Sequence, residues 1–193
     1  MSTHFLQPTW MPEPLARCYE GLPTPRLTVV EPKQMPSPYR ELLVHDGTMT
    51  QMLEGFLGQR LALKVLAQQR GGNSLWRQVL LTESVGGRPV ELGAIRIDLT
   101  CFDERAMALV LEGRIPLGRL LEDSRLEYTS RPECFFSTEA DVPMSEALGV
   151  AGAQRLFGRW NRLLGEGERV LAEVVELLPP LEAAPMRRVA ARK

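Results

Sequence analysis

The chain has 193 residues, 44% hydrophobic and 24% charged, which is typical of one globular domain and not of a disordered chain. Lysine and arginine total 23 against 24 for aspartate and glutamate, so there is no basic excess to bind nucleic acid. No apolar stretch reaches the roughly 18 to 20 residues of a membrane span, and no signal peptide is visible, so we expect a cytoplasmic protein that binds neither nucleic acid nor membrane.

Proline is concentrated at the start of the chain, where eight of the fifteen fall before residue 40. Such a segment cannot form a long helix or a central strand. We expect residues 1–39 to form an extended arm over the domain, anchored by Trp10 and Leu15. The domain itself is predicted at residues 40–181. Residues 182–193 are basic and have no apolar period, so we expect a loose tail there.

The first half of the domain predicts a short helix followed by a sheet. The segment Thr48-Met49-Thr50-Gln51 is a capping-box pattern, and Gly58 marks the end of the helix that it opens. Apolar residues then alternate with polar ones at 61–65, 75–82 and 90–98, which predicts three strands. A glycine-rich turn joins the last two as a hairpin.

The second half predicts one more helix and three more strands. Asp103 is a helix-capping residue, and the helix that it starts runs to Gly113. Residues 116–119 read as a loop. The remaining strands are predicted at 126–135, 156–164 and 169–178. Strands joined mostly by hairpins, with helices inserted, indicate a single α+β domain on an antiparallel sheet of about six strands.

Two charged residues lie on strand faces that are otherwise apolar. Arg77 shares its face with leucine and valine, and so does Glu173 in the last strand. An unpaired buried charge costs several kcal/mol, so each must be paired, neutralised or bound to a ligand. One interpretation is a structural Arg77–Glu173 ion pair, or exposure of one face. The other is an internal pocket with an anion-binding arginine at one end and an acid at the other. Glu176 also lies on an apolar face and is an alternative acid.

Other chemistry-bearing residues give weaker signals. His4 and His45 are the only histidines, which excludes a histidine-rich metal site, and His45 beside Asp46 is typical of a solvated loop. The three cysteines have no C-x-x-C spacing, which disfavours a disulfide framework or a cysteine-based zinc site. We interpret them as core or surface thiols. The glycine pairs lack phosphate-loop spacing and read as turns.

Five blocks, taken in order, resemble the chorismate lyase family. Each block is weak alone, but their order and approximate spacing match over nearly the whole predicted domain. The blocks are Leu42–Thr50, Trp76–Leu81, Gly87–Pro89, Pro116–Arg119, and the pair Leu156–Arg159 with Leu171–Glu173.

The resemblance implies a fold, a reaction and a set of site residues. It implies an antiparallel sheet with helical flaps over a buried site, where chorismate is converted to 4-hydroxybenzoate and pyruvate without metal or organic cofactor. Arg77 would bind the ring carboxylate, aided by the backbone N–H groups of Met49 and Leu117. Glu173 would be the catalytic acid at the 4-oxygen end of the ring, with Glu176 as the alternative. A buried guanidinium suits this anion because it can form two parallel hydrogen bonds with a carboxylate and stays positively charged.

The same fold occurs in UTRA-type ligand-binding domains of bacterial repressors, which bind small effectors and catalyse nothing. The competing hypothesis is therefore a non-catalytic binding protein for an aromatic or carboxylated metabolite. The proline-rich first 40 residues cannot form the helix-turn-helix that such a repressor needs. Both hypotheses predict a small-molecule partner, and neither predicts an oligomeric state.

Overall fold

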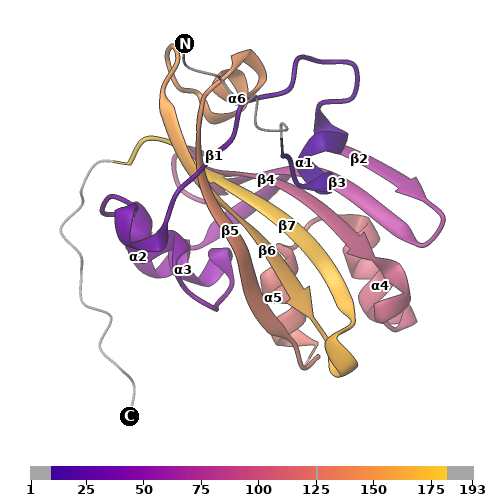
Figure 1. The fold of residues 1–193 in the computed structure, drawn as a ribbon. Helices are drawn as coiled ribbons and strands as arrows, with labels where there is room; N and C mark the ends of the chain where they lie inside the picture. The colour runs from indigo at the N-terminus through magenta and orange to yellow at the C-terminus, as the bar shows by residue number, and fades with distance from the viewer. Residues whose placement is uncertain (1–9, 125, 182–193) are drawn as a thin grey trace.

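A seven-stranded antiparallel sheet lies at the centre of the computed structural model, which describes residues 10–124 and 126–181 (Figure 1). The strand order is β1-β5-β6-β7-β4-β3-β2. The strands are β1 (Thr28–Val29), β2 (Leu61–Gly71), β3 (Ser74–Glu83), β4 (Pro89–Asp98), β5 (Thr129–Glu139), β6 (Arg155–Leu164) and β7 (Val170–Leu178). The predicted α+β class and antiparallel sheet are confirmed, and the strand beyond the expected six is the two-residue β1 at the edge.

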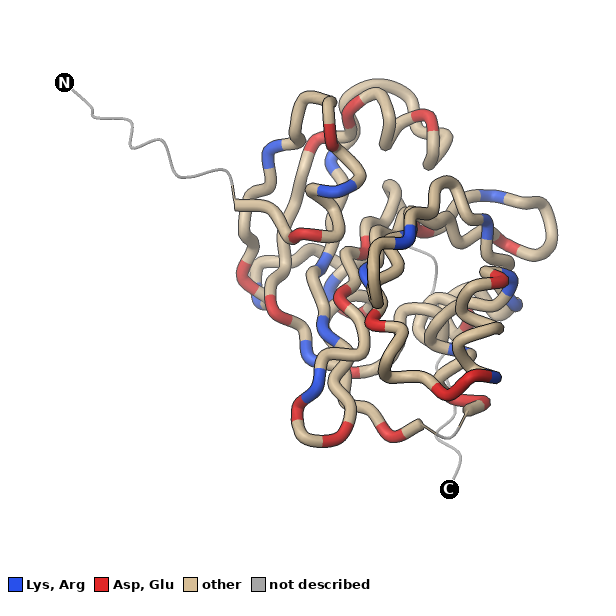
Figure 2. Tube along the Cα trace, turned by 90° about the vertical axis from the view of Figure 1, so that its right-hand side faces the viewer, with Lys and Arg blue, Asp and Glu red and all other residues tan. Residues whose placement is uncertain are grey.

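Six α-helices and three short 3₁₀ helices complete the described part of the chain. The α-helices are α1 (Glu13–Cys18), α2 (Tyr39–Leu43), α3 (Met49–Leu57), α4 (Glu104–Glu112), α5 (Leu117–Asp123) and α6 (Val142–Leu148). The 3₁₀ helices are η1 (Pro32–Gln34), η2 (Leu99–Cys101) and η3 (Glu166–Glu168). Lysine and arginine are interspersed with aspartate and glutamate along the trace, as the near-zero net charge suggests (Figure 2).

The two predicted helices form as their capping residues indicate. The Thr48 hydroxyl accepts a hydrogen bond from the Gln51 N–H at the start of α3, and the Asp103 carboxylate accepts one from the Ala106 N–H at the start of α4. Both helices end at a glycine with φ of 68°, a conformation that costs other residues free energy. Local sequence therefore fixes where the two helices start and stop.

Four of the six α-helices, α1, α2, α5 and α6, were not expected from the sequence. Residues 116–119, interpreted as a loop, begin helix α5, because Pro116 occupies the N-cap position and the apolar face of the following turn is buried. Helix α6 follows β5 and is capped by the Asp141 carboxylate, which accepts a hydrogen bond from the Met144 N–H. Both helices are seven residues long, too short for their periodicity to stand out.

The proline-rich start of the chain is less extended than expected. Leu15 anchors it as predicted and is buried, whereas Trp10 is 39% exposed and packs its ring 5.7 Å from that of Trp160. The segment also contributes helix α1 and strand β1, which pairs with β5. The division of the chain after residue 39 stays a prediction, and the expected basic tail lies outside the described residues.

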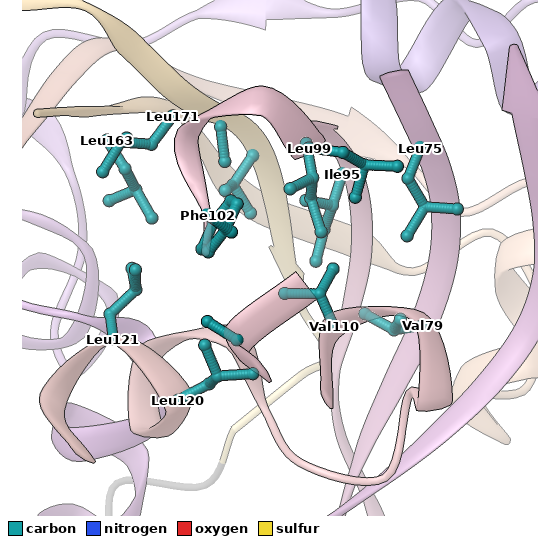
Figure 3. Close-up of a cluster of buried hydrophobic side chains, with 14 residues drawn as sticks. Leu75, Val79, Ile95, Leu99, Phe102, Val110, Leu120, Leu121, Leu163 and Leu171 are labelled. Atoms are coloured by element: carbon teal, nitrogen blue, oxygen red, sulfur yellow. The ribbon is translucent and has the colours of Figure 1, made fainter. Parts of the chain in front are cut away.

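Helices cover both faces of the sheet. On one face, α1 and α6 pack against β4 and β7 through a cluster that includes Leu15 and Met144. On the other face, α4 and α5 contribute Val110, Leu120 and Leu121 to a second cluster (Figure 3). Helices α2 and α3 cover the remaining end of that second face. The face under α3, α4 and α5 is the one that holds the candidate site.

Candidate functional site

A cavity lies between the sheet and the N-terminal ends of α3 and α5. Its volume is about 50 Å³, measured as the space open to the centre of a water molecule. The lining is mostly apolar, with a few polar groups among the aliphatic side chains. It consists of Thr48, Met49, Thr50, Leu63, Val79, Leu81, Glu91, Ile95, Pro116, Leu117, Gly118, Asn161, Leu163, Val174 and Glu176. An apolar cavity with a few polar groups is the usual form of a small-molecule site.

The N-terminal ends of α3 and α5 meet at the cavity. Met49 and Leu117 are the first residues of their helices, and both line it. The first backbone N–H groups of a helix have no partner within the helix, so two sets of donors converge here. The structure thus brings together the two backbone positions that the resemblance assigned to anion binding.

The approach of the two helices depends on the glycine at position 118. A Cβ atom built there would lie 2.8 Å from the Cβ of Thr48. We expect Gly118→Ala to lower the free energy of unfolding by about 1 kcal/mol, because overpacking outweighs the gain in helix propensity. Urea denaturation measures the change. Gly55→Ala is the control, because Gly55 is exposed within α3 and its replacement reports the gain in helix propensity. A stabilised Gly118→Ala protein would contradict the tight contact.

Arg77 lies on the cavity-facing side of β3, two residues before the lining residue Val79. Its side chain is buried, with 4% of the residue exposed, and one Nη donates a hydrogen bond to the carbonyl oxygen of Val110 in α4. The Nε has no partner among the described residues, and no carboxylate there pairs with the guanidinium. Burial lowers the pKa of Arg77, but arginine keeps its charge in proteins. A buried cation without an anion is thus present beside the cavity.

Glu173 lies on the opposite face of the sheet from Arg77. Its carboxylate forms salt bridges with Arg96 at 2.8 Å and Arg162 at 3.2 Å, under helix α1. The structural Arg77–Glu173 ion pair considered from the sequence is therefore not formed. The structure also does not bring Glu173 together with Met49 and Leu117. Successive side chains alternate between faces, so a register error of an odd number of residues moves an acid to the wrong side.

Glu176 is the acid of β7 that faces the cavity. Its carboxylate pairs with the Nε of Arg159 in β6, a side chain with no exposed surface. The other guanidinium donors bind the carbonyl oxygens of Leu43 at 3.2 Å, His45 at 3.0 Å and Gly47 at 3.2 Å. Arg159 therefore holds the segment before α3 against the sheet while it neutralises Glu176.

His45 is packed against Arg159, contrary to the expectation of a solvated loop residue. Its Nδ1 accepts a hydrogen bond from the Gly47 N–H at 3.0 Å, so its Nε2 carries the proton that binds the Leu42 carbonyl at 2.8 Å. These contacts suit the neutral ring. Burial, with a further contribution from the Arg159 charge, lowers the pKa of His45 from 6.5 to about 4.

The lowered pKa of His45 predicts acid sensitivity. The unfolded chain binds a proton near pH 6.5 that the folded protein does not bind until about pH 4. The free energy of unfolding therefore falls as the pH is lowered through this window. We expect His45→Gln to flatten the fall, as measured by urea denaturation at several pH values. Parallel curves for the two proteins would contradict a neutral buried ring.

Glu91 in β4 is a second buried acid at the cavity, and the sequence analysis missed it. It is 4% exposed, and its Oε2 has no partner in the part of the chain that the structure describes. Burial, with a further contribution from Glu176, raises its pKa well above 4.5. The signal was present in the sequence, because Glu91 shares its strand face with Gly93, Ile95 and Ile97. The criterion that singled out Arg77, a charged residue on an otherwise apolar strand face, would also have identified Glu91.

Metal and thiol chemistry have little support in the described residues. No group of three or more His, Cys, Asp or Glu side chains there is placed to hold a metal ion. Cys18, Cys101 and Cys134 are free thiols, and burial raises the pKa of each, to about 11 for Cys18. Helices long and apolar enough to cross a bilayer are also absent from residues 10–124 and 126–181.

Comparison with known proteins identifies the fold. No protein-family model matches the sequence, and no curated protein sequence matches it. Among solved structures, PhnF from Mycobacterium smegmatis matches with a TM-score of 0.54 and 12% identity, over 68% of this chain and 63% of that one. The chain thus spans less than two thirds of PhnF. The fold is chorismate lyase-like.

Two further structures support the chorismate lyase-like fold. The effector domain of PhnF matches with a TM-score of 0.53 and 11% identity, over 68% of this chain and 88% of that domain. The gene product SA0254 from Staphylococcus aureus matches with a TM-score of 0.53 and 8% identity, over 71% of this chain and 90% of that one. Identities this low establish the UTRA-type architecture alone. Membership of the chorismate lyase family, implied by the five sequence blocks, has no support from a family model.

Proposed function

We propose that the protein binds a small aromatic carboxylate in the cavity between the sheet and helices α3 and α5. The observation that carries this proposal is Arg77, a buried guanidinium that lacks an anionic partner in the described residues. A ligand carboxylate would supply that partner and take over the donor now bound to Val110. A bidentate pair of this kind is among the strongest polar contacts in proteins.

The N-terminal ends of α3 and α5 also support the binding of a carboxylate in the cavity. Met49 and Leu117 are the first residues of their helices and line the cavity, and a helix N-terminus favours negative charge. The apolar lining between these helix ends and the acids suits a ring. The resemblance of the architecture to the effector domain of PhnF agrees with a binding role.

A ring-sized ligand requires the cavity to enlarge. Its 50 Å³ holds a few water molecules, whereas ligand pockets are typically about 300 to 1,000 Å³. Helices α3 and α5 cover the cavity, so one of them must move outward as the ligand enters. Binding would therefore be slower than diffusion, as in other sites closed by a lid.

Isothermal titration with 4-hydroxybenzoate tests the proposal. The control is 4-hydroxybenzamide, which keeps the ring and hydroxyl but carries no charge. We expect the acid to bind and the amide to bind at least about 30-fold more weakly, because only the acid can pair with Arg77. Equal affinities, or no binding of the acid, would contradict a carboxylate site.

Chorismate cleavage is the second candidate function. The observation that favours it is the presence of Glu91 and Glu176 at the same cavity, on the face that carries Arg77. A buried carboxyl with a raised pKa can protonate a departing ether oxygen. Incubation with chorismate should then yield 4-hydroxybenzoate and pyruvate, and Glu91→Gln, which replaces the carboxyl with the raised pKa, should lower kcat by about 100-fold or more. Glu173→Gln, on the other face, should change it little. If the protein binds 4-hydroxybenzoate tightly but does not form it from chorismate, the lyase function would be contradicted and the binding function would stand.

A further inference from the structure

Glu91 is a polar group at the cavity whose partner is missing from the described residues. The residue is 4% exposed and lines the cavity, and its Oε2 forms no hydrogen bond there. Leaving a buried polar atom without a partner costs free energy, so such atoms usually mark a bound water or ligand. The proposed pairing of a ligand carboxylate with Arg77 does not involve Glu91.

The backbone of β4 brings Glu91 toward Glu176. A Cβ on Gly93 would lie 3.3 Å from the Oε1 of Glu91, so the carboxyl group folds over this glycine. Gly93 is paired across the sheet with Glu176 in β7. The two carboxyl groups therefore converge at a position that has no side chain between them.

The guanidinium of Arg159 is the one cation that acts on both acids among the described residues. The Nε of Arg159 binds Glu176, and the other donors of Arg159 bind main-chain carbonyls before α3. The groups that line the cavity around Glu91 from other elements are otherwise neutral, namely Thr48 and Thr50 on α3 and Asn161 on β6. Two nearby carboxylates that share one cation cannot both remain ionised at low cost. The raised pKa of Glu91 agrees with the assignment of the shared proton to this residue.

We propose that Glu91 is a specificity-determining residue that donates its carboxyl proton to an oxygen acceptor on the ligand. The site would then take monocarboxylates that carry a hydroxyl or carbonyl oxygen opposite the carboxylate. It would reject a second carboxylate at that opposite position, because the described residues offer no uncommitted cation at the Glu91 end. This inference rests on the proposed binding function and names the class of ligand.

Three probes test the ligand class by isothermal titration. They are benzoate, 4-hydroxybenzoate and terephthalate, which differ only at the position opposite the carboxylate. We expect 4-hydroxybenzoate to bind about tenfold more tightly than benzoate, and terephthalate to bind more weakly than benzoate. Glu91→Leu should abolish the preference for the hydroxyl group, whereas Glu91→Gln, which keeps a donor, should retain it. Glu173→Gln, on the opposite face, should match the wild type.

The outcomes separate the two proposals. If benzoate and 4-hydroxybenzoate bind with equal affinity to the wild type, the role of Glu91 is overturned while carboxylate binding stands. If none of the three probes binds, both proposals are overturned. An infrared measurement adds a test without ligand. We expect the wild type at pH 7 to show a protonated-carboxyl band that is absent from Glu91→Gln and retained in Glu173→Gln. Its absence from the wild type would overturn the inference.

Discussion

Replacing Arg159 with methionine is expected to lower the free energy of unfolding by about 3–5 kcal/mol, the usual cost of leaving a buried charge without its partner. The substitution removes the cation that neutralises Glu176, close to a second acid. It also leaves the carbonyl oxygens of Leu43, His45 and Gly47 without their donor. Urea denaturation at pH 7 measures the effect.

Two further variants show that the loss comes from the buried network. Arg159→Met combined with Glu176→Met should recover part of the loss, because the unpaired carboxylate is removed as well. Arg88→Met is the matched surface control, since Arg88 pairs with Glu83 at 2.5 Å but its side chain is 62% exposed. Its loss should stay below about 1 kcal/mol. A similarly small loss in Arg159→Met would show that the network contributes little to stability.

Arg77→Ala is expected to weaken the binding of 4-hydroxybenzoate by about 30-fold, or about 2 kcal/mol, because the carboxylate loses its charged partner. Isothermal titration measures the change. Arg77→Lys should fall between the wild type and Arg77→Ala, since lysine keeps the charge but cannot form a planar bidentate pair. Arg96→Ala removes an arginine from the opposite face of the same sheet and should alter the affinity by less than about twofold. Unchanged affinity in Arg77→Ala would remove Arg77 from the site.

The six long strands and the two nine-residue helices, α3 and α4, were predictable because their signals are local. Alternation identified β3 and β4 from about ten residues each, and Thr48 and Asp103 identified their helices through hydrogen bonds within one turn. Helix α5 was missed because its seven residues form a helix mainly by packing on the sheet and on α3. Its formation depends on contacts that are distant in the sequence.

The site was predictable in part for a related reason. The apolar neighbours of Arg77 and Glu173 indicated that each charged side chain is buried and needs a partner, and both residues are buried in the structure. The pattern did not show which faces of two distant strands coincide, since that depends on the register of β4 between β3 and β7. Glu176 was weighed and Glu91 was not, although both lie on the face of Arg77. Strand pairing, rather than composition, selects the acids of the site.

The two helices that cover the cavity are attached unequally to the rest of the fold. The segment before α3 is tied to the buried Arg159, whereas the N-terminal half of α5 is tied to α3 by the Arg119–Glu54 ion pair, whose side chains remain 26% and 16% exposed. Salt weakens exposed ion pairs far more than buried ones. Ligand exchange should therefore proceed by outward movement of α5 and accelerate with ionic strength. Amide hydrogens of α5 should also exchange with solvent faster than those of α3.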